Sequence, residues 1–417
     1  MARGQKSFDV IVAGTGPAGM LAALVFSDAG FSVALTGPPA NRTDGRTTAL
    51  MVPALAVLDR VGVLSRIEDA AAPLRIMRIV DATERLIRSP VVTFHASEIA
   101  EPCFGLNIPN QVLNGALEAA AGAATGIERR QSLVDGWEIG EDQVTARLAD
   151  GSSISAKLAV AADGRNSPAR AAAGIRVSGR PYPQSALVLT FAHARGHGFT
   201  STEFHTEDGP FTQVPLPGDR SSLVWVLKPR EAERLAALPE DALSLAVETR
   251  MQSMLGRITV DSQPQIFPLS GSLPSSFAKN RVALVGEAAH MFPPIGAQGL
   301  NLGVRDVQQL IEIASANRED PGNARALATY DSKRRPDILA RTGAVSLLNR
   351  SLLSDMLPAQ IARSAGLSAL GAFGPLRALF MREGLRPGSG FSSLASTVRE
   401  QVRRKRPGGD QVEQHRH

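Results

Sequence analysis

The sequence predicts an α/β fold in which a parallel-sheet domain is interleaved with a second domain built on a mixed β-sheet and is followed by C-terminal helices. Three observations lead to this prediction. A buried strand, a glycine-rich turn and a helix succeed one another at residues 8–30, and the same succession returns at residues 281–315. Between them, residues 181–271 alternate strand-like runs with Gly and Pro turns. The chain therefore leaves its first domain and later comes back to it.

Size and composition agree with two packed domains. The 417 residues exceed what one hydrophobic core normally serves. The apolar fraction of 43% and the charged fraction of 20% exclude a disordered or fibrous chain. The single cysteine, Cys103, excludes an internal disulfide, a dithiol redox pair and a thiolate metal cluster. Redox chemistry in this protein therefore requires a bound cofactor.

Charge and hydropathy bear on the location of the protein. No stretch approaches the roughly 20 apolar residues that span a bilayer, and the first residues lack the apolar region of a signal peptide. The net charge of +5 includes the pair Arg334 and Arg335 and a late basic run at 403–406. We expect a cytoplasmic protein with a solvated basic tail, and a peripheral position at the inner membrane face as the alternative. The basic run has no interleaved aromatic residues, so no nucleic acid is expected as a partner.

The N-terminal elements form a β-α-β unit. Phe8–Ala13 is a nearly continuous apolar run and predicts a buried strand. The helix predicted over Ala18–Ala29 has Pro17 in its first turn and Gly30 as its C-terminal cap. Phe31–Leu35 then predicts the second strand.

Later elements are predicted from the same patterns. Strands are expected at 75–80, 91–94, Val144–Leu148, Ile154, Leu158–Ala162, Ala186–Ala192, Ser222–Leu227 and Arg281–Val285. Helices are expected at Gln111–Gly122, Leu235–Met254, Asn301–Ser315, Ala340–Leu353 and Pro358–Met381. These elements divide the chain into a first domain (1–73, 96–180 and 272–340), a second domain (74–95 and 181–271), C-terminal helices (341–398) and a basic tail (399–417).

The first glycine cluster, Gly14-Thr15-Gly16-Pro17-Ala18-Gly19, predicts a Rossmann-like dinucleotide site. Gly14 permits the tight turn, Gly16 lets the backbone approach a pyrophosphate, and Gly19 lets helix and strand pack closely. The helix N-terminus then offers free N–H groups to the phosphates. The acidic residue that normally holds the adenosine ribose is absent, because the second strand ends in Leu35-Thr36-Gly37-Pro38. Ribose contacts must come from elsewhere or from the Thr36 hydroxyl and backbone.

Two further segments follow buried strands. Asp163 and Gly164 form an acidic turn that suits a position near phosphates, and an Asp-Gly turn before a capped helix is the alternative interpretation. In the segment 285–303, Gly286-Glu287 places an acidic side chain directly after a strand. The prolines and glycines behind it fix a loop, and the helix that starts near Leu300 can stabilise negative charge on a reduced ring.

Together these three segments, in this order, resemble the single-component flavoprotein aromatic hydroxylases over residues 8–340. The runs 44–50 and 298–306, with Tyr330, Arg334, Arg335 and Asp337, resemble the ubiquinone-biosynthesis branch. Two features depart from these patterns. Glu287 stands where the family usually has Asp, and Gly296-Ala297 precedes the glutamine where the ubiquinone branch reads Ala-Gly.

The resemblance implies FAD as the cofactor and assigns its contacts. The glycine cluster (Gly14, Gly16, Pro17, Ala18, Gly19) would cradle the pyrophosphate, with Asp163 and Gly164 beside it, and Gly286 and Glu287 would meet the ribityl chain. The backbone of Gly299, Leu300 and Asn301 would face the flavin pyrimidine, Arg46 and Gln111 would be further contacts, and the Pro294 carbonyl would lie near the oxygen-bearing ring carbon.

The resemblance also implies the reaction. NAD(P)H reduces the flavin, O2 reacts with it, and an aromatic ring is hydroxylated. Only one GxGxxG is present, so NAD(P)H is expected to bind transiently. No catalytic side chain is assigned, since the cofactor carries the chemistry. A polyprenyl phenol of ubiquinone biosynthesis is the expected substrate. A small soluble aromatic, or a non-catalytic role as a flavoprotein partner in a biosynthetic complex, is the alternative.

Other conspicuous residues receive structural interpretations. His193 and His197 lack a third metal ligand, so no metal site is expected. His290 is expected to fix loop geometry rather than to act as a base. Tyr182 and His205 are conceivable pocket residues. Leucines and other apolar residues of 347–381 are expected to pack on the protein or to touch a membrane surface.

Overall fold

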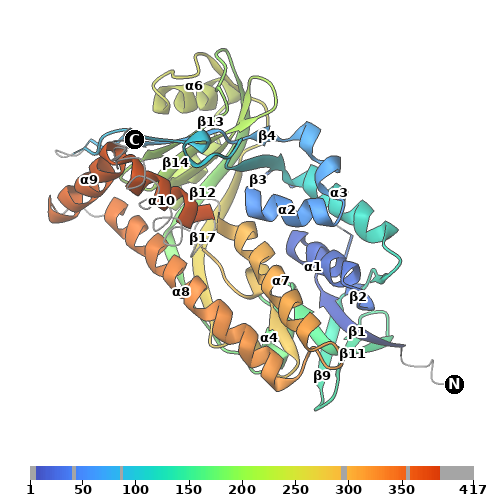
Figure 1. Cartoon of the computed structure of the whole chain (residues 1–417). Helices are drawn as coiled ribbons and strands as arrows, with labels where there is room; N and C mark the ends of the chain where they lie inside the picture. The colour runs from blue at the N-terminus through green and yellow to red at the C-terminus, as the bar shows by residue number, and fades with distance from the viewer. Residues whose placement is uncertain (1–5, 40–43, 85–87, 293–297, 354–356, 386–417) are drawn as a thin grey trace, which may run out of the picture.

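The computed structural model describes residues 6–39, 44–84, 88–292, 298–353 and 357–385 (Figure 1). Its first sheet has β1 (Lys6–Ala13) at the centre, parallel to β2 (Val33–Thr36) on one side and to β11 (Ser153–Ala161) on the other. The order β18-β19-β11-β1-β2-β8 continues to β8 (Ile127–Arg130) and, at the other edge, to β19 (Val282–Leu284) and β18 (Ala278–Lys279). The strands predicted near residues 8, 31, 158 and 281 thus lie side by side.

Buried apolar strands explain this sheet. The last four residues of β1 are buried, and all four residues of β2 are buried, because helices cover the sheet. The helix α1 (Pro17–Asp28) follows β1 and packs against α3 (Asn110–Ala123) and α7 (Gln298–Ala316). The antiparallel strands β9 (Val134–Ile139) and β10 (Val144–Leu148) extend the sheet from β11.

The second sheet is mixed and runs in the order β16-β12-β15-β14-β13-β5-β6, with β17 also paired to β12. Its strands are β5 (Ile76–Asp81), β6 (Val92–His95), β12 (Val177–His193), β13 (Thr200–His205), β14 (Pro210–Leu216), β15 (Arg220–Leu227), β16 (Ile258–Val260) and β17 (Gln265–Pro274). Figure 1 shows this sheet and the first sheet at different ends of the molecule, with the long strands β12 and β17 running between them.

One face of the mixed sheet is covered by α5 (Pro229–Ala236) and α6 (Glu240–Arg250). The sequence analysis predicted a single helix at 235–254, and this prediction was wrong. Pro239 has no N–H to donate and restricts the residue before it, so the chain turns between the two helices.

The opposite face meets a small sheet of β3 (Thr47–Met51), β4 (Ala72–Pro73) and β7 (Gly105–Pro109), which the sequence did not predict. The helix α2 (Val52–Arg60) follows β3 directly. The Thr47 and Ser222 hydroxyl oxygens lie 2.9 Å apart and join the small sheet to β15 of the mixed sheet. The short helix α4 (Pro168–Ala172) lies near β9 and β11 of the first sheet.

Three helices close the described chain: α8 (Ala324–Leu353), α9 (Leu357–Ala372) and α10 (Gly374–Leu385). The prediction of one helix at 358–381 was wrong, because Gly374-Pro375 interrupts it. Met381 of α10 is buried with Leu74, Phe94 and Phe104, so this helix packs on the second domain. Among the described helices, none is long and apolar enough to cross a membrane.

Candidate functional site

The turn between β1 and α1 explains each glycine of the first cluster. A Cβ atom on Gly14 would lie 2.2 Å from the Ala162 carbonyl oxygen, and one on Gly19 would lie 2.0 Å from the Gly14 carbonyl oxygen. A Cβ on Gly16 would meet no atom within 4 Å. Packing therefore requires Gly14 and Gly19, whereas Gly16 faces open space.

This open space lies at the start of α1, where no side chain caps the helix. The N–H groups of the first turn are therefore free to bind an anion, and the helix dipole favours negative charge there. Ala18 and Gly19 supply such N–H groups, while Pro17 has none to lose. The turn fits a pyrophosphate.

Asp163 lies beside the same turn, since its backbone nitrogen would be 2.9 Å from a Cβ on Gly14. Its Oδ2 atom accepts a hydrogen bond from the Ala169 N–H at 3.1 Å, but its buried Oδ1 atom has no partner among the described residues. Burial raises the pKa of this carboxyl above its usual value, against hydrogen bonds from Ser167 and Ala169 that lower it. An unpartnered buried oxygen at the mouth of a phosphate turn is suited to meet a ligand donor.

The same segment also forms the capped turn that was the alternative interpretation. The Ser167 hydroxyl oxygen accepts from the Arg170 N–H at 3.0 Å and caps α4. Gly164 adopts φ +83°, and a Cβ there would meet nothing within 4 Å. The buried Arg170 guanidinium donates to the Ala288 carbonyl at 2.8 Å, so this turn is tied to the third segment.

In the third segment, Glu287 is exposed although the residues on either side, Val282–Gly286 and Ala288–His290, are buried. Gly286 adopts φ +62°, a conformation that favours glycine, and a Cβ there would lie 3.0 Å from the Ala18 side chain. The turn therefore packs against α1 and directs one carboxylate outward.

Arg46 is held in place before any ligand binds. Its guanidinium donates to Asp44 Oδ1 at 2.8 Å and to Asp44 Oδ2 at 2.7 Å, and it lies over the Phe267 ring at 4.9 Å from the centroid. The hydrogen bond to Asp44 raises the pKa of Arg46, to which the Glu287 charge also contributes. Burial alone would raise the pKa of Asp44, but the bonds from Arg46 and Asn110 lower it overall. Arg46 thus carries its charge near Glu287.

Sequence reasoning missed Asp44, Asn110 and Phe267 as partners of Arg46. Asn110 is the first residue of α3, and its Nδ2 donates to Asp44 Oδ2 at 2.9 Å while its Oδ1 accepts from the Thr48 hydroxyl at 2.6 Å. Asp44 lies in the same run 44–50 as Arg46, but the pattern of this run does not indicate that the two side chains pair. The contacts with Asn110 and Phe267 arise between distant segments.

Of the remaining predicted residues, Asn301 at the start of α7 contacts β3. The Asn301 amide accepts from the Met51 N–H at 2.9 Å and donates to the Ala49 carbonyl at 2.7 Å. Gly299 and Leu300 lie in the first turn of α7, and Gly299 has open space around it. Gln111 is exposed at the start of α3. Pro294 lies outside the described residues.

The adenosine end of the site lacks a visible anchor at Thr36. This side chain is 1% exposed, and its hydroxyl turns inward toward the Val12 carbonyl at 3.4 Å. Of the two sources considered for ribose contacts, the Thr36 hydroxyl is therefore disfavoured.

Other candidate side chains are engaged elsewhere. His193 lies 3.1 Å from the Ser221 hydroxyl, and His197 lies 3.0 Å from the Leu216 carbonyl. No cluster of metal-ligating side chains occurs within the part of the chain that the structure describes. His205 is buried beside Glu203 at 2.9 Å, and Tyr182 packs on the apolar cluster of Ala186, Val188, Val226 and Leu269.

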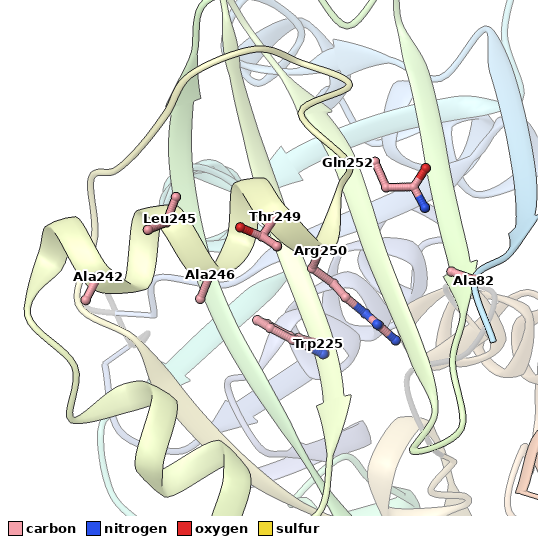
Figure 2. Close-up of a pocket in the computed structure, with 8 residues that line it drawn as sticks. All are labelled: Ala82, Trp225, Ala242, Leu245, Ala246, Thr249, Arg250 and Gln252. Carbon is pink, nitrogen blue, oxygen red and sulfur yellow. The ribbon is translucent and has the colours of Figure 1, made fainter. Parts of the chain in front are cut away.

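A hollow of about 460 Å³ lies under α6 on the helix-covered face of the mixed sheet. Figure 2 shows Ala242, Leu245, Ala246 and Thr249 along α6, with Trp225 on the strand below. Trp225 belongs to the core under α5 and α6, whereas its neighbours Val224 and Val226 belong to the cluster on the other face of β15. This hollow is therefore separate from the side of the sheet that carries Phe267 and Arg46.

Comparison with known proteins agrees with this geometry. The family described as "FAD binding domain" matches residues 7–342. Ubiquinone hydroxylase UbiL of Rhodospirillum rubrum is 33% identical over 392 residues, which cover 91% of this chain and 90% of the relative. The 3-demethoxyubiquinol 3-hydroxylase of Escherichia coli is 29% identical over 384 residues, which cover 88% and 96%.

A solved structure shares the fold. The p-nitrophenol 4-monooxygenase PnpA of Pseudomonas putida superposes with a TM-score of 0.73 at 22% identity, covering 93% of this chain and 98% of that one. The glycine turn, the outward carboxylate and the family match lead to one conclusion. The chain belongs to the single-component FAD-dependent aromatic-ring monooxygenases, which use NAD(P)H as the reductant.

Proposed function

We propose that this enzyme hydroxylates a polyprenyl phenol of ubiquinone biosynthesis. The observation that carries the proposal is the near full-length match to a ubiquinone hydroxylase, which covers 91% of this chain. Two features of the structure support it: an apolar sheet face beside Arg46, and exposed apolar side chains on α10.

The apolar sheet face suits an apolar ring. Ala186, Val188, Val226 and Leu269 form a buried cluster on the mixed sheet, and Phe267 joins this cluster to Arg46. None of these five cluster members is charged or polar. A site with such a wall excludes water, which protects an oxygenated reduced cofactor from unproductive decay. We propose that the aromatic ring of the substrate lies against this face.

The exposed side chains of α10 suit contact with a membrane surface, from which a polyprenylated substrate has to be taken. Phe373, directly before α10, is 63% exposed, and Leu376 and Phe380 of α10 are 41% and 57% exposed. Phe380 stacks on Phe94 at 6.1 Å between ring centroids, so this helix is fixed to the second domain. The basic run at 403–406 follows in the sequence and would favour anionic lipids. We therefore propose a peripheral position at the inner membrane face, with a biosynthetic complex as a further partner.

The chain's own residues then have defined tasks. Bound FAD supplies the redox and oxygen chemistry. We propose that the N–H groups around Gly16 bind its pyrophosphate, that Glu287 binds its ribityl hydroxyls, and that Arg46 places positive charge beside the ring. Leu300 would direct its N–H toward the pyrimidine edge from the start of α7.

The proposal is tested with purified, FAD-loaded protein and a short-chain prenyl phenol. We expect NAD(P)H oxidation that depends on the phenol and a product heavier by one oxygen atom. A small phenol without the prenyl chain is the matched control. Faster coupled turnover with the control would favour the alternative of a small soluble aromatic. NAD(P)H oxidation that yields only hydrogen peroxide with every phenol, together with stable binding to a partner protein, would favour the non-catalytic alternative.

A further inference from the structure

A buried carboxylate beneath the third segment accepts three hydrogen bonds and forms an ion pair. Asp306 of α7 is 0% exposed. Its Oδ2 atom accepts from the Gly286 N–H at 2.9 Å and from His290 Nε2 at 2.7 Å. Its Oδ1 atom lies 2.8 Å from Arg334 Nε and 2.7 Å from Arg334 Nη2. Both carboxylate oxygens of Asp306 therefore accept hydrogen bonds, Oδ2 from the loop and Oδ1 from Arg334.

The charge of Asp306 is balanced by Arg334 of α8, which is also 0% exposed. Burial alone would lower the pKa of Arg334, but the nearby Asp306 charge raises it, so Arg334 keeps its positive charge. Arg334 Nη1 also donates to Asp337 Oδ2 at 2.7 Å. Each of these two buried charges depends on the other, because removing one partner leaves the other charge uncompensated.

The same carboxylate fixes the histidine of the loop. A carboxylate only accepts, so the imidazole nitrogen that faces it, Nε2 of His290, carries the hydrogen. The other side of the His290 ring stacks on Phe292, with centroids 5.4 Å apart. His290 is 3% exposed, in agreement with a role in loop geometry.

Neighbouring residues of the turn are anchored by other elements. Tyr330 donates its hydroxyl to the Leu284 carbonyl at 2.8 Å, and burial raises the pKa of this phenol, which keeps it protonated. Arg170 donates to the Ala288 carbonyl at 2.8 Å, and Met291 pairs with Ser272 of β17. Glu287 is the exposed residue in the middle of these anchors.

We propose that Asp306 is a positioning residue for the turn 286–290. Through its hydrogen bonds to Gly286 and His290 it sets the direction of the Glu287 carboxylate toward FAD. It does not touch the cofactor. It holds Gly286 and His290, the two ends of the turn, in one arrangement. The ion pair with Arg334 compensates the buried charge of Asp306.

The test is Asp306→Asn. An amide has one acceptor atom, so the variant loses either the hydrogen bonds from Gly286 and His290 or the one from Arg334. We expect the Kd for FAD to rise on the order of tenfold, which corresponds to about 1.4 kcal/mol. We also expect a changed visible absorption and circular dichroism spectrum of the bound flavin at saturating FAD. The matched control is Asp320→Asn, which removes the carboxylate from another buried arginine, Arg281, at 2.7 Å. This control is expected to lower the melting temperature of the apoprotein while FAD affinity and the flavin spectrum stay unchanged.

A second variant keeps the test decisive if Asp306→Asn does not fold. His290→Phe retains the ring stack on Phe292 but loses the bond to Asp306. We expect it to weaken FAD binding less than Asp306→Asn does and to alter the flavin spectrum. Unchanged FAD affinity and spectrum in His290→Phe would overturn the proposal. So would equal weakening of FAD binding by Asp320→Asn, because the effect would then be one of general stability.

Discussion

The Arg46 guanidinium lies over the Phe267 ring, 4.9 Å from its centroid, and this contact joins the residue directly before β3 of the small sheet to the strand β17 of the mixed sheet. Arg46 is the side chain whose pKa responds to the Glu287 charge, and Phe267 belongs to the apolar cluster proposed to face the substrate. The residues proposed to face the cofactor and those proposed to face the substrate are therefore in direct contact.

We predict that Phe267→Leu removes the cation–π contact that holds the Arg46 side chain but keeps the apolar core packed. Leucine keeps an apolar side chain but has no π-face, and a partly exposed cation–π contact is worth about 0.5 to 1 kcal/mol. A double-mutant cycle with Arg46→Gln, measured by urea unfolding, should show a coupling energy of this size. A coupling energy of zero would mean that the ring only fills space.

We predict that Gly16→Ala weakens FAD binding and leaves the fold stable, whereas Gly14→Ala destabilises the fold. Gly16 adopts φ −72°, and a Cβ there meets nothing within 4 Å, so apoprotein stability should change by less than about 0.5 kcal/mol. FAD affinity should fall at least about tenfold, because the new methyl group occupies the path of the pyrophosphate. Gly14→Ala is expected to cost about 3 kcal/mol or more through its φ of +113° and its clash with Ala162. The measurements are thermal melting and FAD titration, and equal FAD affinity for Gly16→Ala and wild type would contradict the site.

We predict that Glu287→Gln raises the Kd for FAD about tenfold, since a hydrogen bond to a charged group contributes about 1.5 kcal/mol. The apoprotein should melt at an unchanged temperature, because Glu287 is exposed and accepts no hydrogen bond from the described residues. Glu287→Asp restores the side chain usual in the family and should bind FAD as tightly as wild type. The exposed Glu312 of α7 provides the control substitution Glu312→Gln. If Glu287→Gln and the control behave alike, the carboxylate is not a ligand.

We predict that Asp163→Asn stabilises the apoprotein in a pH-dependent way. Burial raises the pKa of Asp163 in the folded state, so ionisation opposes folding at every pH above the unfolded value of 3.8. The gain of the variant should be absent well below pH 3.8, grow as the pH rises through the folded pKa, and then stay constant, at about 2 °C in melting temperature. The exposed Asp142→Asn serves as the control. A gain that is largest at acid pH would show the opposite sign and refute the argument.

Local patterns in the sequence predicted much of the first domain. The strand at 8–13, the helix after it and the strand at 144–148 are confirmed. The first strand is a nearly continuous apolar run that stops at Gly14, whereas 144–148 alternates apolar residues with Thr145 and Arg147. The helix predicted at 235–254 failed at Pro239, which periodicity alone does not register. The assignments of FAD contacts to individual residues and the division into domains remain predictions.

Long-range contacts set the limit for the candidate site. Asn110 and Asp44 are 66 positions apart in the chain, and their hydrogen bond depends on the pairing of β3 with β7, which places Pro109 beside Thr47. The pairing of Asp306 with Gly286 and Arg334 likewise joins three separate elements. The sequence contains each of these residues within family-like runs, but their partners become evident only from the tertiary structure.

The anchoring of the Leu284 carbonyl by Tyr330 and of Asp306 by Arg334 has a consequence for biosynthesis of the protein. All three segments of the site leave the ribosome before α8 does, and we expect the third segment to take its final shape only after α8 has docked, because Tyr330 and Arg334 of α8 hold it. A nascent chain that stops before Tyr330 would therefore display the sequence signature of a flavoprotein without retaining the flavin. During translation, FAD should therefore be retained only once α8 has emerged and packed against the third segment.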